Sequence, residues 1–188
     1  MIALCVGHSR LGDSGAQSVD GTSEWVYNSR VANILQADLC SIGIVARVYD
    51  DYRKHTYSAA MVWLSRQLKA DGAHAAVELH FNSAGSTANG FEYLHWRGSA
   101  RGTALASRIH AAHVAACPDD KDRGIKSKGS GDRGAAFLRL THCPAVICEP
   151  FFGSNGPEWV EWGDSAERLA AIYAAGIADW MDTESPRR

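Results

Sequence analysis

Short, unbroken runs of apolar residues constrain this chain most, because longer segments with helical spacing separate them. The runs 2–7 and 145–149 have almost no polar alternation, which is typical of strands that are buried on both faces. In 57–68, by contrast, apolar residues recur three and four positions apart, as on one face of a helix. This alternation predicts an α/β fold, with a twisted, mostly parallel sheet of about six strands and helices on both faces.

The apolar runs and the helical spacing also predict where each strand and helix lies along the chain. Strands are expected at 2–7, 43–49, 75–81, 90–96, 137–140 and 145–149, and helices at about 24–40, 57–68, 99–116 and 164–181. The stretch 118–134 is charged and rich in glycine, which predicts a surface loop. A length of 188 residues, 46% of them hydrophobic, suffices for one core, so 1–182 are expected to form a single domain and 183–188 a frayed tail.

The charge balance excludes two classes of partner. The chain has 19 Lys and Arg against 21 Asp and Glu, a net charge of -2. Proteins that bind nucleic acid or an anionic bilayer usually carry a strong cationic bias, so neither nucleic acid nor membrane insertion is expected. No basic segment precedes the first apolar run and no cleavage site follows it, which predicts synthesis in the cytoplasm without a signal peptide.

The cysteines and one histidine pair are further candidates for metal ligands. Five cysteines form no closely spaced pair, which argues against a disulfide framework and against zinc held by cysteines. His110 and His113 stand three apart on an expected helix, a spacing that can hold a metal. Because no third ligand accompanies them in the sequence, both are expected on a solvent face.

Polar residues stand at the ends of three expected strands. His8 follows the first strand, His80 lies near the end of the third, and Glu149 ends the last. Ligands of an open parallel sheet bind beyond the carboxyl ends of its strands, so we expect these side chains to share one crevice. The alternative is that each histidine is an ordinary core or rim residue.

His8, His80 and one carboxylate would complete the protein ligands of a catalytic zinc site, which keeps its fourth position open. Glu24 is the candidate carboxylate, because it begins a helix and the glycine-rich loop after His8 allows the chain to return to the same sheet edge. The alternative for Glu24 is a first-turn acid that complements the helix dipole. The spacing of the three residues matches no short zinc motif.

Several segments resemble, in order, one family of enzymes. They are Val6-Gly-His8, Glu24-x-x-x-Asn28, Glu78-Leu-His-Phe-Asn82-Ser-Ala84, Gly90-Phe-Glu-Tyr93, Asp122-Arg-Gly-Ile-Lys126, Phe137-Leu-Arg-Leu-Thr-His-Cys-Pro-Ala-Val-Ile-Cys-Glu149 and Ser154-Asn155. Together they resemble the zinc-dependent N-acetylmuramoyl-L-alanine amidases of bacterial autolysins and phage endolysins. The resemblance covers nearly the whole chain, so 1–182 are expected to be a zinc amidase catalytic domain.

The resemblance implies a site and a reaction. His8, Glu24 and His80 correspond to the family's zinc ligands, and Glu149 corresponds to its catalytic acid/base. The implied activity is hydrolysis of the amide between N-acetylmuramic acid and L-alanine in peptidoglycan. The family fold, a mostly parallel sheet of about six strands, agrees with the fold expected from the apolar runs.

Three further residues are assigned roles near this site. Glu78 stands where the family usually has a small or hydroxyl residue, and the strand period turns it to the same face as His80. We expect Glu78 to accept a hydrogen bond from a ligand histidine, the alternative being a rim charge. Asn82 is expected to position the substrate and Arg123 to meet a peptide carboxylate, the alternative for Arg123 being a solvated surface charge.

The function expected from the sequence is therefore that of a monomeric peptidoglycan amidase of the phage endolysin type. Such an enzyme acts on the bacterial cell wall once it is released during host-cell lysis. One alternative is a cytosolic zinc amidohydrolase or carboxypeptidase that acts on a small N-acyl amino acid. The other is a wall-binding or regulatory domain without activity, which the presence of both Glu24 and Glu149 disfavours.

Overall fold

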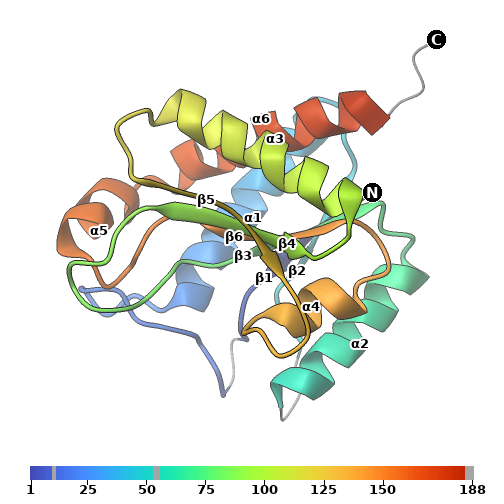
Figure 1. Ribbon diagram of the computed structural model, residues 1–188, viewed down its shortest axis with the longest axis horizontal. Helices are drawn as coiled ribbons and strands as arrows, with labels where there is room; N and C mark the ends of the chain where they lie inside the picture. Colours follow the sequence, from blue (N-terminus) through green and yellow to red (C-terminus); the bar gives the residue numbers. More distant parts are fainter. Residues whose placement is uncertain (10–11, 53–55, 185–188) are drawn as a thin grey trace.

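One sheet runs through the protein, whose computed structural model describes residues 1–9, 12–52 and 56–184 (Figure 1). In this described part the sheet has six strands in the order β2-β1-β3-β6-β4-β5. The strands β1, β2, β3 and β6 are parallel, whereas β4 is antiparallel to β6 and parallel to β5. Their bounds are β1 (Ile2–Val6), β2 (Ala46–Tyr49), β3 (Ala75–Leu79), β4 (Phe91–Trp96), β5 (Asp122–Lys128) and β6 (Ala145–Glu149). The expected α/β fold in a single domain is confirmed.

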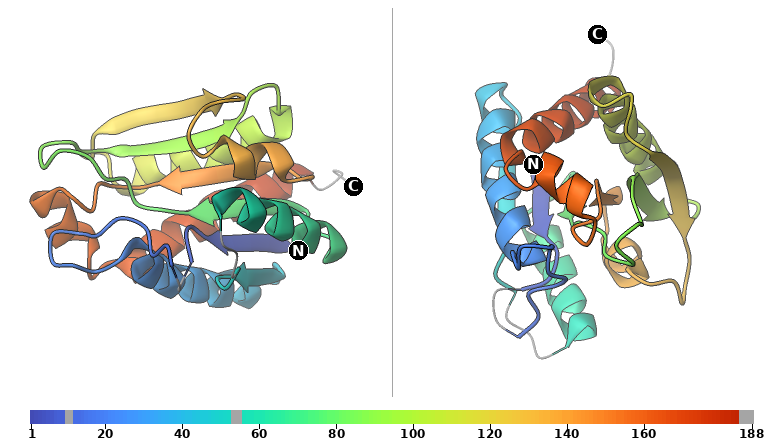
Figure 2. Two further views of the ribbon diagram at one scale, coloured as in Figure 1. Left: turned by 90° about the horizontal axis from the view of Figure 1, so that it is seen from below. Right: turned by 90° about the vertical axis from the view of Figure 1, so that its left-hand side faces the viewer.

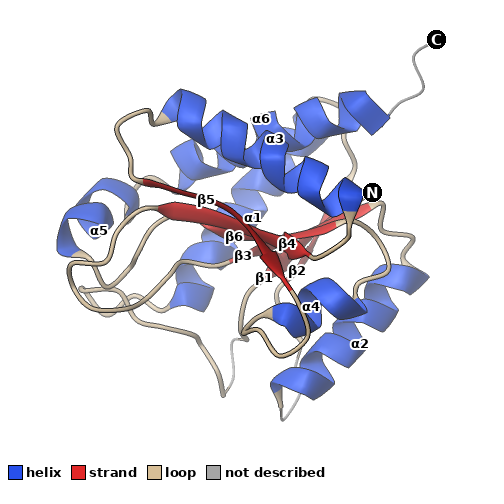
Figure 3. Cartoon of the chain, in the orientation of Figure 1, coloured by secondary structure: helices blue, strands red, loops and turns tan. Residues whose placement is uncertain are grey.

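Helices cover both faces of the sheet (Figures 1 and 3). The larger core lies under α1 (Glu24–Ser41), α3 (Ala100–Ala116) and α6 (Ala166–Glu184). The smaller core lies under α2 (Tyr57–Ala70) and α4 (Ala135–Leu140). Figure 2 shows α2 and α4 in front of the sheet, with α3 and α6 behind it. The short helix α5 (Gly156–Trp162) lies beyond the end of β6.

Local sequence signals account for most of these boundaries. Ser23, Thr56 and Ser99 cap α1, α2 and α3, because each hydroxyl accepts a hydrogen bond from a backbone N–H of the first turn. The strands β1 and β3 are buried at every position, as their mainly apolar runs predict, and in β3 this includes the charged Glu78. Successive side chains of each strand point into opposite cores. Glu78 therefore lies on the face of the sheet that borders the smaller core.

Two sequence predictions about local structure are wrong. The run 137–140 was expected to be a strand, but it belongs to α4 and packs Phe137 and Leu138 into the smaller core. An apolar run this short fits either element, and only its packing against α2 decides. The stretch 122–128 was expected to lie in a loop, but it forms β5 at the sheet edge, where a strand with exposed charged residues is tolerated.

The helix α5 was not predicted at all, although its start carries clear signals. Asn155 accepts a hydrogen bond from the backbone N–H of Glu158, and Pro157 stands in the first turn. Glu158 in turn accepts backbone hydrogen bonds from Gly90 and Phe152 at 2.6 and 2.7 Å. Its carboxylate thus joins the start of β4 to the segment that follows β6, at the edge where the site lies.

The C-terminal helix α6 ends at Glu184, so Thr183 and Glu184 are its last residues. The rest of the predicted tail, 185–188, lies outside the described residues. Across the described ranges, none of the helices combines the length and apolar character needed to span a bilayer.

Candidate active site

Parallel register brings three of the predicted site residues to one edge of the sheet. Val6 is paired with Leu79 across β1 and β3, and Leu79 with Cys148 across β3 and β6. His8, His80 and Glu149 stand at or just beyond the ends of these strands. His8 has a positive φ of 68°, a rare conformation for a residue with a side chain, and it turns the chain away from β1.

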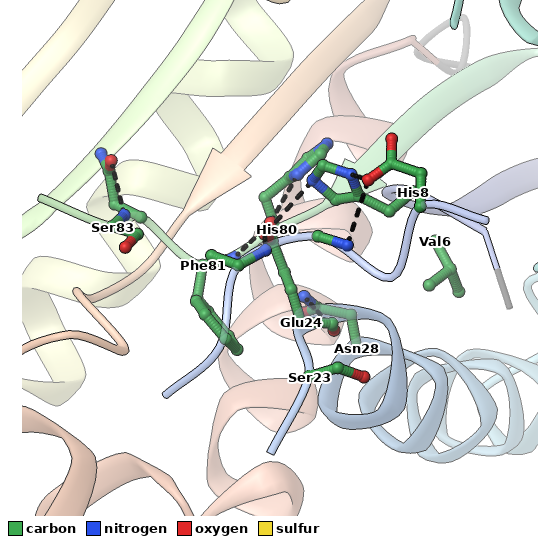
Figure 4. Close-up of polar contacts among 12 residues, drawn as sticks. Val6, His8, Ser23, Glu24, Asn28, His80, Phe81 and Ser83 are labelled. Carbon is green, nitrogen blue, oxygen red and sulfur yellow. Dashed lines mark hydrogen bonds and ion pairs between the residues drawn. The ribbon is translucent and has the colours of Figure 1, made fainter. Parts of the chain in front are cut away.

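Glu24 reaches the same edge from the first position of α1 (Figure 4). Its Oε1 lies 2.7 Å from His80 Nδ1, and its Oε2 lies 3.2 Å from His8 Nε2. The backbone N–H of Phe81 donates to Oε1, and that of Ala16 donates to Oε2. Each carboxylate oxygen therefore meets one imidazole and one backbone amide, which holds both oxygens in fixed directions.

These three side chains suit a metal ion by chemistry and by space. One ligand atom from each of His8, Glu24 and His80 lies within 4.8 Å of the others. Two imidazoles and one carboxylate form a set that catalytic zinc sites use. Two glycines keep the cluster compact, because a Cβ on Gly7 would lie 2.2 Å from the His80 ring and one on Gly15 would lie 2.6 Å from His8.

Charge sharing within the cluster shifts the pKa of each member. Burial would raise the pKa of Glu24, but hydrogen bonds from His8 and His80 hold it well below its usual range. Burial would likewise lower the pKa of both imidazoles, yet contacts with Glu24 raise the pKa of each, and Glu78 raises that of His80 further. The cluster is therefore a buried, ionised carboxylate flanked by two imidazoles, an arrangement that favours positive charge next to Glu24.

The ring nitrogens that face away from Glu24 also meet carboxylates. His8 Nδ1 lies 3.1 Å from Asp13, and His80 Nε2 lies 3.4 Å from Glu78, which is buried. In metal sites such carboxylates fix the tautomer and orientation of ligand histidines. Glu78 lies on the same face as His80, and its role in supporting a ligand histidine stays a prediction. Asp13 was not predicted, because it lies in the loop after β1 with no pattern to distinguish it.

Glu149 ends β6 beside this cluster, and its buried Oε2 has no hydrogen-bond partner among the residues that the structure describes. Burial is the main cause that raises its pKa to about 7, opposed by His80 and reinforced by the charges of Glu24, Glu92 and Glu78. A carboxyl group with a pKa near 7 is suited to take up and release a proton at neutral pH.

A cavity of about 390 Å³ opens in front of these groups. Asn82 lines it, with its Oδ1 accepting a hydrogen bond from the backbone N–H of Ser83. Arg123 is not among the lining residues; its guanidinium is paired with Glu92 at 2.7 Å and lies over the Phe152 ring.

Two cations that the sequence did not single out, Lys128 and Arg133, line the cavity. Lys128 ends β5, and Arg133 directly precedes the residue that caps α4. Their position follows from the two elements that were predicted wrongly, which explains why neither was identified from the sequence.

The family to which the chain belongs follows from comparison with known protein families. Residues 2–179 match the amidase-3 family, described as N-acetylmuramoyl-L-alanine amidase. The chain belongs to this family. It is accordingly a hydrolase of peptidoglycan, as the resemblance read from the sequence implied. Comparison with curated protein sequences yields no significant match.

Solved amidase structures share the fold over nearly the whole chain. The catalytic domain of CwlV from Bacillus (Paenibacillus) polymyxa var. colistinus is 26% identical, with a TM-score of 0.77 and coverage of 96% of this chain and 98% of that one. AmiC2 of Nostoc punctiforme is 20% identical, with a TM-score of 0.81 and 97% of each chain covered. The catalytic domain of an endolysin targeting Clostridia difficile is 23% identical, with a TM-score of 0.81 and coverage of 95% and 96%.

Proposed function

We propose that this amidase cleaves the bond between N-acetylmuramic acid and L-alanine with zinc held by His8, Glu24 and His80 and with Glu149 as acid and base. The observation that carries the proposal is the buried, unpaired oxygen of Glu149 beside three mutually close ligand side chains. A general base needs a free oxygen and a suitable pKa, and Glu149 has both. The family match supports the choice of substrate.

Zinc in this position would supply Lewis acidity, which lowers the pKa of a water molecule and polarises the scissile carbonyl. Glu149 accepts a proton from the attacking water as the new C–O bond forms at the lactyl carbonyl. The same carboxyl group then donates this proton to the L-alanine nitrogen as the C–N bond breaks. Glu149 ends the cycle in its starting state, and no covalent intermediate with the protein is needed.

The walls of the cavity indicate how the peptide would be held. Muropeptide stems carry carboxylates, and Lys128 and Arg133 place two cations on the cavity wall. Asn82 is proposed to position the substrate backbone from the same cavity. Arg123 is proposed to act at the rim, where it shares Glu92 with Lys126.

Digestion of purified sacculi tests the proposal directly. Mass spectrometry of the products should show released stem peptides with free L-alanine amino groups, and the glycan strands should stay uncut. A chelator should prevent the release of the stem peptides. Release of sugar fragments, or activity that a chelator leaves unchanged, would contradict it. Turnover of small N-acyl amino acids without action on sacculi would instead favour the amidohydrolase alternative.

We also propose that the enzyme is a monomer of the endolysin type. An endolysin catalytic domain shares its fold over nearly the whole chain. Size-exclusion chromatography with light scattering should give the mass of a single chain, 20.3 kDa. In bacteria, cytoplasmic expression should cause lysis only when a second protein opens the inner membrane, and lysis without such opening would argue against this type.

A further inference from the structure

A second group of potential metal ligands lies where α3 ends and the chain turns toward β5. His113 is in the last turn of α3, Cys117 is its C-cap, and Asp120 follows three residues later. One ligand atom from each lies within 4.8 Å of the others. We propose that His113, Cys117 and Asp120 form a second metal site, separate from the catalytic cavity, that binds Zn²⁺ or a similarly soft divalent cation.

His113 is the anchor of this site, because its ring is buried and fixed. The ring is fully buried, stacks on Phe91 with centroids 4.0 Å apart, and meets the edge of Trp162. Its Nδ1 lies 2.6 Å from the Tyr93 hydroxyl, whereas its Nε2 has no hydrogen-bond partner within the described part of the chain. The solvent face expected for His113 is therefore wrong. A buried ring nitrogen without a partner is costly, and a metal ion would satisfy it.

Asp120 completes the geometry from the solvent side. Its Oδ2 lies 3.7 Å from His113 Nε2, which is too long for a hydrogen bond. A tetrahedral zinc ion with bonds of about 2.0–2.3 Å separates neighbouring ligand atoms by roughly 3.4 Å. The observed separation is close to this value. The Asp120 side chain is 19% exposed, so an ion would reach the site from solvent, which would also provide the fourth ligand.

Cys117 gives the site its preference for a soft ion. Its side chain is buried, and the guanidinium of Arg168 donates to its sulfur at 2.9 Å. Burial raises the pKa of the Cys117 thiol and Arg168 only partly opposes this shift, so a bound ion would itself have to displace the proton to give the thiolate that binds metals. Arg168 is itself paired with Glu161 at 3.0 Å, so it adds little net positive charge against a cation. A thiolate and a carboxylate together balance the charge of a divalent ion.

Paired thiolates, whose absence from the sequence disfavours zinc held by cysteines, are not needed in this arrangement. Here a single cysteine follows a histidine by four residues, one helical turn, and the carboxylate comes from the loop that the helix end directs. Metal binding would fasten this loop to α3. Because the loop leads directly into β5, which ends at Lys128, the site would stabilise one wall of the catalytic cavity.

Cobalt(II) distinguishes the two sites, because only a thiolate ligand gives an intense charge-transfer band in the near ultraviolet. The catalytic cluster has no cysteine among its ligands. With thiols kept reduced, cobalt added to the wild-type protein should produce this band, and the Glu24→Ala variant should retain it. Cys117→Ser should abolish the band. Equilibrium dialysis with Zn²⁺ should give two ions per wild-type chain and one in either variant.

Matched variants make the test specific. Cys40→Ser, at an exposed free cysteine, should leave the band intact, whereas Asp120→Asn should weaken it and Asp119→Asn should not. Absence of the band in the folded wild-type protein would overturn the proposal, as would its persistence in Cys117→Ser. Neither result bears on the catalytic site, because Cys117→Ser leaves His8, Glu24, His80 and Glu149 in place.

Discussion

Glu149 stands directly opposite Glu92 across the antiparallel pair of β6 and β4. The two carboxyl groups share a sheet edge but differ in their partners. Burial opposes ionisation of Glu92, yet Arg123 and Lys126 hold its pKa below the usual value, whereas burial raises the pKa of Glu149 to about 7. Because the pKa values of the two groups shift in opposite directions, Glu92 stays an anion at neutral pH while Glu149 can exchange a proton. This difference supports the role proposed for Glu149.

Replacing Glu149 with Gln should remove turnover and leave the metal in place. The variant keeps the size of the side chain but cannot accept the proton, so kcat should fall by about 10²- to 10⁴-fold. Metal analysis of the purified variant should still find zinc at the catalytic site. A Glu167→Gln control, at an exposed carboxylate that pairs with Arg30, should keep full activity. Loss of zinc from Glu149→Gln would instead make Glu149 a ligand.

The pH profile should report the ionisation of Glu149. A general base must be deprotonated, so kcat/KM should fall as pH decreases through a pKa of about 7 rather than near 4.5, the ordinary value. Glu24, Glu78 and Glu92 raise this pKa and His80 lowers it. Glu92→Gln removes one negative charge and leaves Arg123 and Lys126 uncompensated, so it should move the acid limb to lower pH. An unshifted limb would mean that another group controls it.

Gly7 should be intolerant of a side chain because of its contact with His80. A Cβ there would lie 2.2 Å from the His80 ring, so Gly7→Ala should displace a proposed ligand and weaken zinc binding at least about tenfold. It should also destabilise the fold by about 1–3 kcal/mol. Gly85→Ala is the matched control, because a Cβ at Gly85 meets nothing within 4 Å. Isothermal titration with zinc and chemical denaturation measure the two effects.

The carboxylates behind the two histidines should tune metal affinity. Asp13→Asn and Glu78→Gln each remove the charge that orients a ring nitrogen, so each should weaken zinc binding by about 10- to 100-fold. Asp38→Asn, at a half-buried position in the second half of α1, serves as the control. Competition with a chelator of known affinity gives the ratio. Equal affinities in all three variants would show that the contacts are incidental.

The two cations on the cavity wall should affect binding more than chemistry. Lys128→Gln and Arg133→Gln should each raise KM for a muropeptide about two- to fivefold, with kcat nearly unchanged, as expected for partly exposed ion pairs. The effect should shrink in high salt and for a substrate with amidated carboxylates. Lys69→Gln, near the end of α2, is the control. A fall in kcat at constant KM would place these residues in the chemical step instead.

The sequence by itself determined the fold class and the elements with strong local signals. The buried strands β1, β3 and β6 follow from short runs that are apolar except at Glu78 and Glu149, and α1, α2 and α3 from helical spacing with a capping hydroxyl at each start. These signals also placed His8, His80 and Glu149 at strand ends and Glu24 at a helix start. Parallel strands end at a common edge, so the proximity of the four residues could be anticipated.

Only the tertiary structure decided what depends on partners distant in the chain. The run 137–140 became helical because α2 and the sheet offered it a surface, and 122–128 became a strand because β4 had an open edge. The same long-range packing occupies Arg123 with Glu92 and places Lys128 and Arg133 at the cavity. It also buries the Nε2 of His113 beside Asp120. A sequence does not display such contacts, because packing between distant elements produces no local periodicity.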